Sequence, residues 1–598
     1  MTGSTGQRTK AAQAAFFVSA VGSQEADSRI GSSDRFEHSV GGLLPGWPGA
    51  AATAALLAAL PARPWFVLLL VLYLLPITLG HEPWKSQDLV HGAVVAHMLA
   101  NGEWLTPHLA AETGVIRPPL YYWLGAGLAT IRPSWLAWYD AARLATTLFV
   151  GFHLALLMLT ARVLCSQTLA SWLALLVGLS CVGLLVPGHE MQPAVAALAS
   201  STLMAWAWAA LAQERMLVAG SLALGVGGGA ALLSAGLPAV LPGFLIAPVL
   251  LVLPAWRRRG VALGVLAALA VASLLHAAWW FSVSSQGLDT WWPSVLRGLN
   301  AVSRPGNNLL DYLALLLTDT WPVWPLAAWG LWRMRRRAFE PAIALPVSLL
   351  AAMLAVQALI VPARALGALP LAMPLSLLAV PGLVSLRRGA ANLFHWFAVC
   401  TGLLGILMVW LGWVAMTQGW PPAIARNFAK LEPGYTLPLQ VGAIVAAVAV
   451  TILFLTGLRR IPRSPISGAI HWAVGLSLVW CLIALLWLPW VDQGRNYRKL
   501  MAPIGRLVQA QGGCVQGRNL SETHVAGLQV YAGIVIRPRG QGCEWLVLAR
   551  RLKDGASGTP DGWQLVLETS RPGLGAERFG LYRRVGVALA RDAAPNTL

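Results

Sequence analysis

The residues best suited to chemistry gather in one stretch, residues 81–141, of a chain that otherwise carries few charges. Glu82 and Asp88 offer carboxylates, which could accept a proton, and Lys85 and Arg117 offer cations, which could hold an anionic group such as a phosphate. Polar side chains at a membrane surface are functional candidates by default. The alternative is a solvated loop with an amphipathic interfacial helix and an aromatic belt.

The rest of the chain demands a membrane. Of its 598 residues, 57% are hydrophobic and 11% are charged, whereas soluble domains are roughly 45–50% apolar and about 25% charged. A soluble globular protein, a disordered chain and a collagen-like fold are therefore excluded. The 29 tryptophans suit a protein that meets two membrane interfaces.

Thirteen segments are apolar over the about 20 residues that a helix needs to cross a bilayer. Clusters of arginine occupy alternate loops between them, which predicts a cytoplasmic N-terminus and an external C-terminus. The net charge of +19 is therefore an orientation signal, and we expect no nucleic-acid partner. The predicted spans are 62–80, 142–161, 169–187, 192–212, 217–234, 237–253, 261–280, 309–332, 341–361, 366–386, 393–415, 438–457 and 470–491.

Three regions follow from this pattern. Residues 1–61 read as a cytoplasmic, mostly disordered tail, and 62–492 as an all-α membrane domain whose external first loop is 81–141. Residues 493–598 read as a small external α/β domain, because short β-type runs at 530–536, 545–548, 563–567 and 579–585 alternate with Gly and Pro. An oxidising outer compartment favours a disulfide between Cys514 and Cys543; the alternative is two unrelated reduced thiols.

Short motifs follow one another in order along the chain. They are a lead-in at 81–85, MLANGEW at 98–104, RPPLYYW at 117–123, DAARL at 140–144, and Arg364 followed by Leu-Pro at 369–370. This series resembles the polytopic glycosyltransferases of the GT-C type, in particular the bacterial aminoarabinose lipid A transferase and protein mannosyltransferase group (glycosyltransferase 39 type). Thirteen spans with an external C-terminal domain also match the aminoarabinose transferase architecture.

The resemblance implies transfer of a sugar from a polyprenyl phosphate, such as undecaprenyl phosphate, to a lipid or glycan acceptor such as lipid A. The reaction would occur at the outer face of a bacterial inner membrane, where the lipid tail holds the donor in the bilayer. The departing phosphate is anionic, so nearby cations would stabilise it. The candidate donor-binding residues are Lys85, Arg117, Tyr121, Tyr122 and Arg364. The alternative for the basic ones is interfacial snorkelling.

Several positions depart from the family pattern. The usual catalytic Asp corresponds to Gln87, whose amide cannot act as a general base. The next acidic residue is Asp88, the acidic position before the Lys-Pro-Pro motif is Ile116, and that of a later motif is Pro193. The loss of these carboxylates weakens the case for a divalent metal site. A divalent metal is therefore possible but unidentified, and the sequence predicts no definite cofactor.

Three explanations remain open. Another carboxylate, namely Asp88, Glu82 or Glu190, could replace the missing base. Alternatively, a phosphate acceptor needs no base, because its second pKa is near 6. The third explanation is an inactive paralogue that binds lipid-linked sugar without transferring it. A lipid or sugar transporter, from another class, would more naturally show repeated halves and charges within its spans.

Further polar residues could form an acceptor site or the rim of the donor site. They are His189, Glu190, His276, Arg297 and Arg304. The alternatives are satisfied interfacial histidines and ordinary solvated loops.

Overall fold

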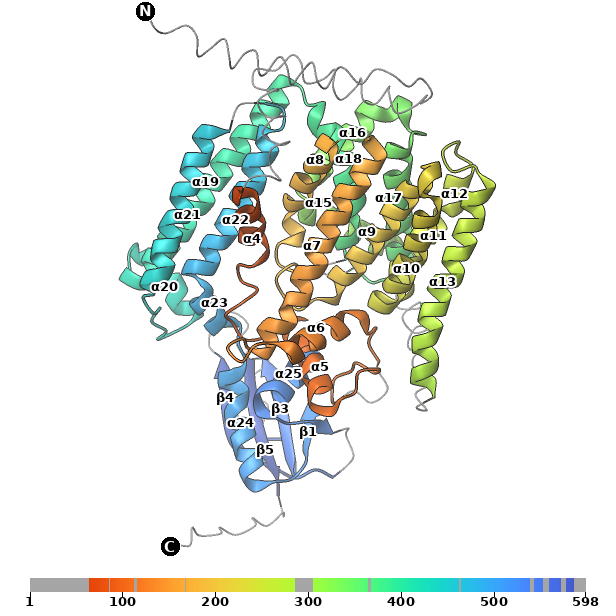
Figure 1. Cartoon of the computed structure of the whole chain (residues 1–598). Coiled ribbons are helices and arrows are strands. Elements are labelled where there is room, and N and C mark those ends of the chain that lie inside the picture. Colours follow the sequence, from red (N-terminus) through yellow and green to blue (C-terminus); the bar gives the residue numbers. More distant parts are fainter. Residues whose placement is uncertain are drawn as a thin grey trace, which may run out of the picture.

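The structure is a computed structural model, and it consists of a bundle of helices with a small sheet domain at one end (Figure 1). The bundle and the domain together occupy the described part of the chain. The structure describes residues 64–84, 87–111, 116–166, 168–285, 305–363, 367–461, 464–537, 542–551, 559–571 and 577–585. The predicted N-terminal tail, 1–61, lies outside these residues.

Eight of the described helices are long and apolar enough to cross a membrane. Most of α9 is buried, whereas little of α13 and α21 is buried. Exposed apolar faces of this extent suit lipid and not water. The eight are α7 (Trp138–Cys165), α9 (Pro193–Leu211), α10 (Leu217–Ala235), α13 (Arg259–Ser284), α17 (Pro341–Ile360), α19 (Arg388–Gln418), α21 (Val441–Arg460) and α22 (Ser467–Leu486).

The other five predicted spans are also helical, but shorter or interrupted. A proline removes a backbone donor, and Pro322 stands where α15 gives way to α16. The multi-pass helical architecture is confirmed, while the count of thirteen spans stays a prediction. The five are α4 (Pro64–Leu74), α8 (Thr168–Leu179), α11 with α12 (Leu237–Leu245 and Ala247–Leu251), α15 with α16 (Pro305–Asp319 and Val323–Met334), and η5 with α18 (Leu369–Leu371 and Ala372–Val384).

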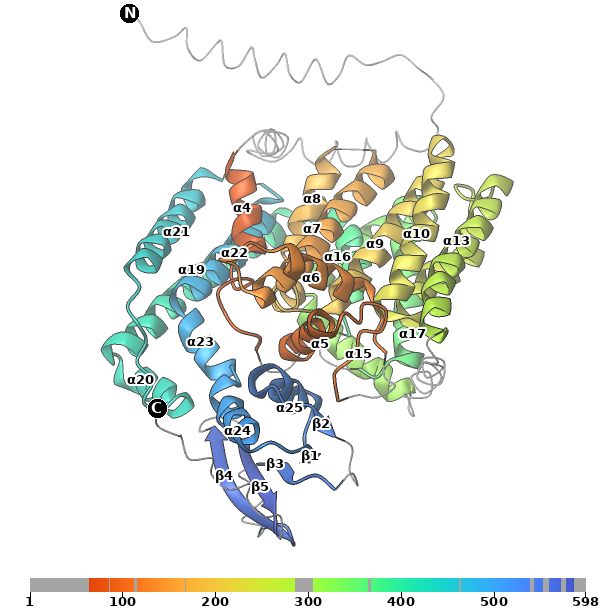
Figure 2. The ribbon, with the colours of Figure 1, turned by 60° about the horizontal axis from the view of Figure 1, so that its bottom comes forward.

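Two helices of the first loop, α5 (Gln87–Asn101) and α6 (Leu120–Ile131), lie at the end of the bundle that faces the sheet (Figures 1 and 2). They stand between the spans and the C-terminal domain. The first loop is therefore a folded layer, which fixes its polar side chains.

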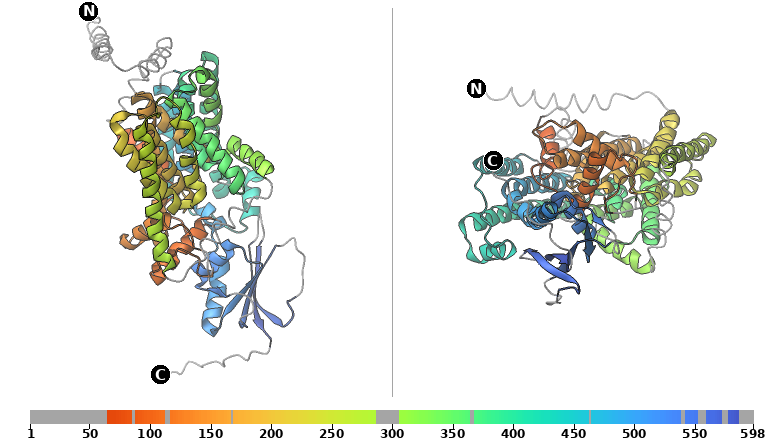
Figure 3. Two further views of the ribbon diagram at one scale, coloured as in Figure 1. Left: turned by 90° about the vertical axis from the view of Figure 1, so that its right-hand side faces the viewer. Right: turned by 90° about the horizontal axis from the view of Figure 1, so that it is seen from below.

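The described residues of the C-terminal domain form a five-stranded sheet in the order β2-β1-β3-β5-β4. The pairs of β1 with β2 and with β3 are parallel, and the pairs of β5 with β3 and with β4 are antiparallel. Figure 3 shows this sheet extending from the bundle. Its elements are α23 (Leu488–Arg495), α24 (Arg498–Gln511), β1 (Val515–Arg518), α25 (Glu522–Gly527), η6 (Leu528–Ala532), β2 (Ile536–Arg537), β3 (Trp545–Arg551), β4 (Trp563–Arg571) and β5 (Glu577–Arg584).

Cys514 and Cys543 form a disulfide, with sulfurs 2.06 Å apart. They precede the parallel neighbours β1 and β3, so pairing of these strands brings them together. Three of the four predicted β-type runs lie mainly in strands. The run 530–536 reaches a strand only at Ile536, the first residue of β2, because most of it belongs to the helical turn η6 and to the loop after it. Packing of this turn against the first loop overrides its β-propensity.

Close approach of helices depends on glycine at one crossing in the bundle. A Cβ on Gly330 of α16 would lie 2.2 Å from the carbonyl oxygen of Leu378 in α18. A Cβ on Gly382 of α18 would lie 2.0 Å from the carbonyl oxygen of Leu326 in α16. Small residues at such crossings allow two backbones to touch.

We expect Gly330→Ala to lower stability by about 1–3 kcal/mol, because the added methyl group would force α16 and α18 apart. The matched control is Gly389→Ala, at a helical position where a Cβ meets nothing within 4 Å. The melting temperature of the purified protein in detergent measures both. Equal melting temperatures for the two variants would contradict this account of the crossing.

Candidate active site

A fully buried arginine, Arg143, forms the centre of the polar layer between the bundle and the first loop. Its Nε and NH2 donate to the two carboxylate oxygens of Asp88 at 3.2 and 3.4 Å, and NH1 donates to Asp140 at 2.8 Å. NH1 and NH2 also donate to the carbonyls of Thr78 and His81. These bonds match the five N–H donors of a guanidinium.

Asp88 is fully buried and accepts four hydrogen bonds. Besides those from Arg143, the backbone N–H groups of Trp84 and Met191 donate to it at 2.9 and 2.7 Å. Burial alone would raise its pKa, but Arg143, His81 and the two N–H groups outweigh burial and lower the pKa. Such a carboxylate is a weak base. The geometry makes Asp88 a positioning residue that joins α5, α7 and the segment before α9.

Glu190 lies beside this cluster, in the connection between α8 and α9. Burial and the nearby charge of Asp88 raise its pKa to about 7, although Arg495 and Arg143 oppose the shift. Arg495 NH1 donates to Glu190 Oε1 at 3.1 Å. A carboxyl group with a pKa near neutrality can change protonation at physiological pH. The pKa of Glu190 therefore suits a carboxylate that would replace the missing base better than the lowered pKa of Asp88 does.

Glu82 is held by the beginning of the C-terminal domain. Its Oε2 accepts hydrogen bonds from Asn496 Nδ2 at 2.6 Å and from Arg498 Nε at 2.8 Å. Next to it, Trp84 Nε1 donates to Asp492 Oδ1 at 2.8 Å. We call Asp88, Glu190, Glu82 and their arginine partners the ion network; it joins both parts of the chain.

Arg117 precedes α6, and its side chain is 19% exposed. It forms an ion pair with Glu522, at the start of α25 in the C-terminal domain. A cation with partial solvent access, paired with an exposed carboxylate, can exchange that partner for an anionic ligand. Of the predicted phosphate-binding cations, Arg117 is the one in the described residues.

Tyr121 and Tyr122 are buried in the protein. The hydroxyl of Tyr121 lies 2.7 Å from Thr146 Oγ1, and that of Tyr122 lies 2.7 Å from His91 Nδ1. The structure therefore assigns both tyrosines to the packing of α5, α6 and α7. A direct contact with donor stays a prediction for them.

The remaining predicted residues are spread more widely. His189 is buried next to Glu190, with its ring nitrogens 2.5 and 2.6 Å from the carbonyl oxygens of Leu185 and Tyr73. His276 lies on α13, with its ring 5.6 Å from that of Trp279. Gln87 is half-buried at the start of α5. Lys85, Arg297, Arg304 and Arg364 lie outside the described residues.

Sequence reasoning missed the residues that join the first loop to the C-terminal domain. Gln529 accepts a hydrogen bond from Ala110 N at 3.1 Å and donates to the carbonyl of Ala93 at 2.7 Å. The hydroxyl of Tyr531 donates to the carbonyl of Pro83 at 2.7 Å. No sequence pattern marks these contacts, because each joins segments more than 400 positions apart.

We expect Asp88→Asn to destabilise the protein by about 3–5 kcal/mol, because it leaves the buried charge of Arg143 without one of its two carboxylates. The matched control is Glu568→Gln, which removes an exposed pair with Arg578 and costs at most about 1 kcal/mol. Melting temperatures in detergent compare the two. A wild-type melting temperature for Asp88→Asn would show that the ion network does not depend on this carboxylate.

Comparison with known proteins agrees with this architecture. No protein-family model matches the chain. Two undecaprenyl phosphate-alpha-4-amino-4-deoxy-L-arabinose arabinosyl transferases match it in sequence. The one from Erwinia tasmaniensis is 27% identical over 37% of this chain and 39% of its own length. The one from Pseudomonas fluorescens is 28% identical over 46% of this chain and 50% of its own length. The matches thus span half or less of these relatives.

Two solved structures of ArnT from Cupriavidus metallidurans are similar in fold to most of this chain. The apo structure has a TM-score of 0.58 and 16% identity, and covers 87% of this chain and 98% of that one. The structure bound to undecaprenyl phosphate has a TM-score of 0.60 and 17% identity, and covers 86% and 98%. The chain therefore has the GT-C fold of the aminoarabinose transferases, and in sequence it resembles this family as its motifs predicted.

Proposed function

We propose that this protein is a membrane glycosyltransferase that takes a sugar from a polyprenyl phosphate, of the undecaprenyl phosphate class, and transfers it to a lipid acceptor. The observation that carries the proposal is the fold shared with an ArnT bound to undecaprenyl phosphate, over 86% of this chain. The partial sequence match to two arabinosyl transferases supports it. Two carboxylates of the ion network, Asp88 and Glu82, lie in the first loop, where most motifs of this group also lie.

We propose that the first loop and the C-terminal domain face the outer side of a bacterial inner membrane. The last turns of α7, α16 and α21 carry Arg162, Arg333 and Arg459, and these helix ends lie opposite the sheet domain (Figure 1). Positive residues favour the cytoplasmic side. The disulfide in the domain also suits an oxidising compartment.

In the reaction, an acceptor oxygen forms a bond to the anomeric carbon while the bond from that carbon to the donor phosphate oxygen breaks. The polyprenyl phosphate leaves with the electron pair. Arg117 would exchange Glu522 for this phosphate and stabilise the charge that develops on it. Two observations support this role for Arg117: its side chain is partly exposed, and its ion-pair partner Glu522 belongs to the C-terminal domain.

We propose a phosphate-bearing acceptor, such as lipid A. The position of the family's usual base is Gln87, and Asp88 is committed to Arg143. An anionic phosphate oxygen can attack without losing a proton, so positioning and charge stabilisation suffice. The protonation of Glu190 would then control Arg495. When Glu190 is protonated, it no longer forms an ion pair with Arg495, and Arg495 becomes available to an anion.

A second candidate function has one observation in its favour. Position 87 carries an amide, and the carboxylate of Asp88 already accepts four hydrogen bonds within the protein. The chain could therefore bind a lipid-linked sugar without transferring it. Donor binding without product would identify this case. Nothing comparable favours a transporter.

Labelled sugar from an undecaprenyl phosphate donor should reach lipid A when the full-length protein is assayed in nanodiscs. We expect Arg117→Ala to lower the rate by about 10²-fold or more, the usual effect of removing one charge-stabilising group. Arg578→Ala, an exposed arginine of the C-terminal domain, is the matched control. Full activity of Arg117→Ala would exclude the phosphate role, and saturable binding without product would establish the second function.

The pH profile tests Glu190. Raising the pH through about 7 ionises this carboxyl group, which pairs Arg495 and adds negative charge beside two anionic substrates. We therefore expect the wild-type rate to fall above pH 7, and Glu190→Gln to remain active at higher pH. If the rate of Glu190→Gln is instead about 10²- to 10⁴-fold lower than that of the wild type at every pH, Glu190 is a general base and the acceptor is a hydroxyl group.

A further inference from the structure

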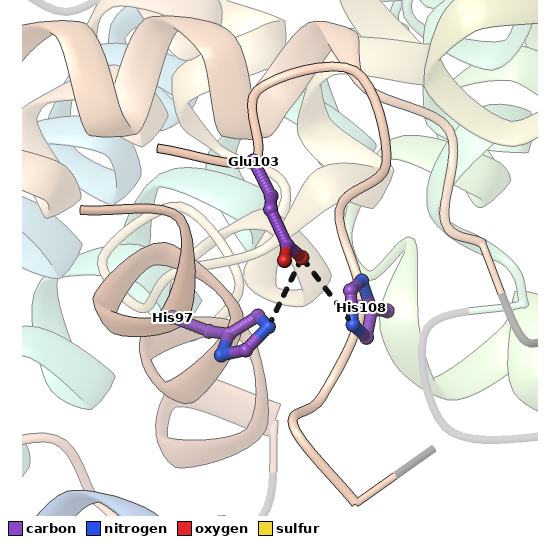
Figure 4. Close-up of side chains that lie close together, drawn as sticks. All are labelled: His97, Glu103 and His108. Atoms are coloured by element: carbon purple, nitrogen blue, oxygen red, sulfur yellow. Dashed lines mark ion pairs between the residues drawn. The ribbon is translucent and has the colours of Figure 1, made fainter. Parts of the chain in front are cut away.

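Three side chains of the first loop converge at a place separate from the ion network (Figure 4). His97 belongs to the last turns of α5, and Glu103 and His108 follow in the connection to α6. One ligand atom from each lies within 4.8 Å of the other two. Glu103 Oε2 is central, at 3.3 Å from His97 Nε2 and 3.6 Å from His108 Nε2.

These separations suit a shared metal ion better than hydrogen bonds. A charge-assisted N–H···O bond is about 2.7–2.9 Å long, and 3.6 Å lies beyond hydrogen-bond range. Two ligand atoms at about 2.0–2.1 Å from a tetrahedral zinc ion are roughly 3.3–3.4 Å apart. The Glu103 oxygen therefore stands from each imidazole at nearly the spacing of two ligands of one ion.

The far side of each imidazole has a partner that can orient the ring. His108 Nδ1 lies 2.6 Å from the carbonyl oxygen of Thr106, so Nδ1 donates and Nε2 keeps a lone pair toward Glu103. The Asn101 amide nitrogen lies 2.8 Å from His97 Nδ1. Rotation of this amide by 180° would bring its oxygen toward Nδ1, which would then donate and leave the lone pair on His97 Nε2. Partners of this kind orient metal-binding histidines in known sites.

We propose that His97, Glu103 and His108 bind a divalent transition-metal ion of the zinc class. Two imidazoles and one carboxylate suit zinc and its neighbours, whereas magnesium and calcium prefer oxygen alone. In the described residues no fourth His, Cys, Asp or Glu joins the group. Since Glu103 is 45% exposed, the fourth position falls to water or to an oxygen anion.

The ion would fix the segment that joins α5 to the membrane helices. The carbonyl of Leu105, between the ligands, accepts a hydrogen bond from Trp279 Nε1 of α13 at 3.0 Å. The carbonyl of Trp104 accepts one from Trp123 Nε1 of α6 at 2.7 Å. A metal ion that holds Glu103 and His108 to α5 would therefore hold these contacts too. This role does not depend on sugar transfer.

The test is metal binding by the full-length protein in nanodiscs, after removal of any histidine tag. Isothermal titration with Zn²⁺ should give one site per chain, and Co²⁺ in the same site should give visible absorption of a low-symmetry complex. His97→Ala, Glu103→Gln and His108→Gln should each weaken Zn²⁺ binding by more than about tenfold, since even outer partners of a metal site contribute 10- to 100-fold.

The matched control is His395→Ala. His395 and His471 form a second histidine pair, with rings 4.7 Å apart. In the described residues, no carboxylate joins this pair to form a possible metal site. Binding should survive this change. The proposal fails if wild-type protein takes up no stoichiometric Zn²⁺, or if the three ligand variants, folded by their melting temperatures, bind Zn²⁺ and Co²⁺ as the wild type does.

Discussion

The burial of Arg143 is the constraint on which the rest of the site depends. A guanidinium removed from water costs several kcal/mol unless paired and hydrogen-bonded. Here Asp88, Asp140 and two carbonyls satisfy it. Satisfying it fixes α5 against the start of α7, and the bond from Met191 to Asp88 fixes the segment before α9. The charge of Asp88 in turn contributes to the raised pKa of Glu190.

The C-terminal domain completes this arrangement. Arg495 pairs with Glu190, Arg498 pairs with Glu82, and Glu522 pairs with Arg117, so three charges of the membrane domain have partners between residues 495 and 522. Without these partners, the buried Glu190 and the half-buried Glu82 would lack their paired cations, and Arg117 would lack its carboxylate. The domain and the first loop therefore form one electrostatic unit.

The sequence predicted what depends on local pattern. Apolar runs located the eight described helices that are long and apolar enough to cross a membrane, because the bilayer imposes a length on each span, and charge in alternate loops suggested an orientation. Pairing of Asp140 with Arg143 is local too, at a spacing of three on one helix face. The link from Asp88 to Arg143 crosses 55 positions and that from Glu190 to Arg495 crosses 305. No periodicity encodes such pairs, and so the sequence could not separate a structural carboxylate from a chemical one.

Positions 87 and 88 show why that separation matters. Successive residues of a helix point about 100° apart, and here Gln87 is half-buried while Asp88 is fully buried. A carboxylate at 87 could face a substrate, but the chain has an amide there. The carboxylate at 88 faces Arg143 and is ionised by it. A proton transfer at this site would therefore involve a group outside this pair, and Glu190, whose pKa is raised to about 7 and which accepts a hydrogen bond from Arg495, is a neighbouring carboxyl group whose charge can change near neutral pH.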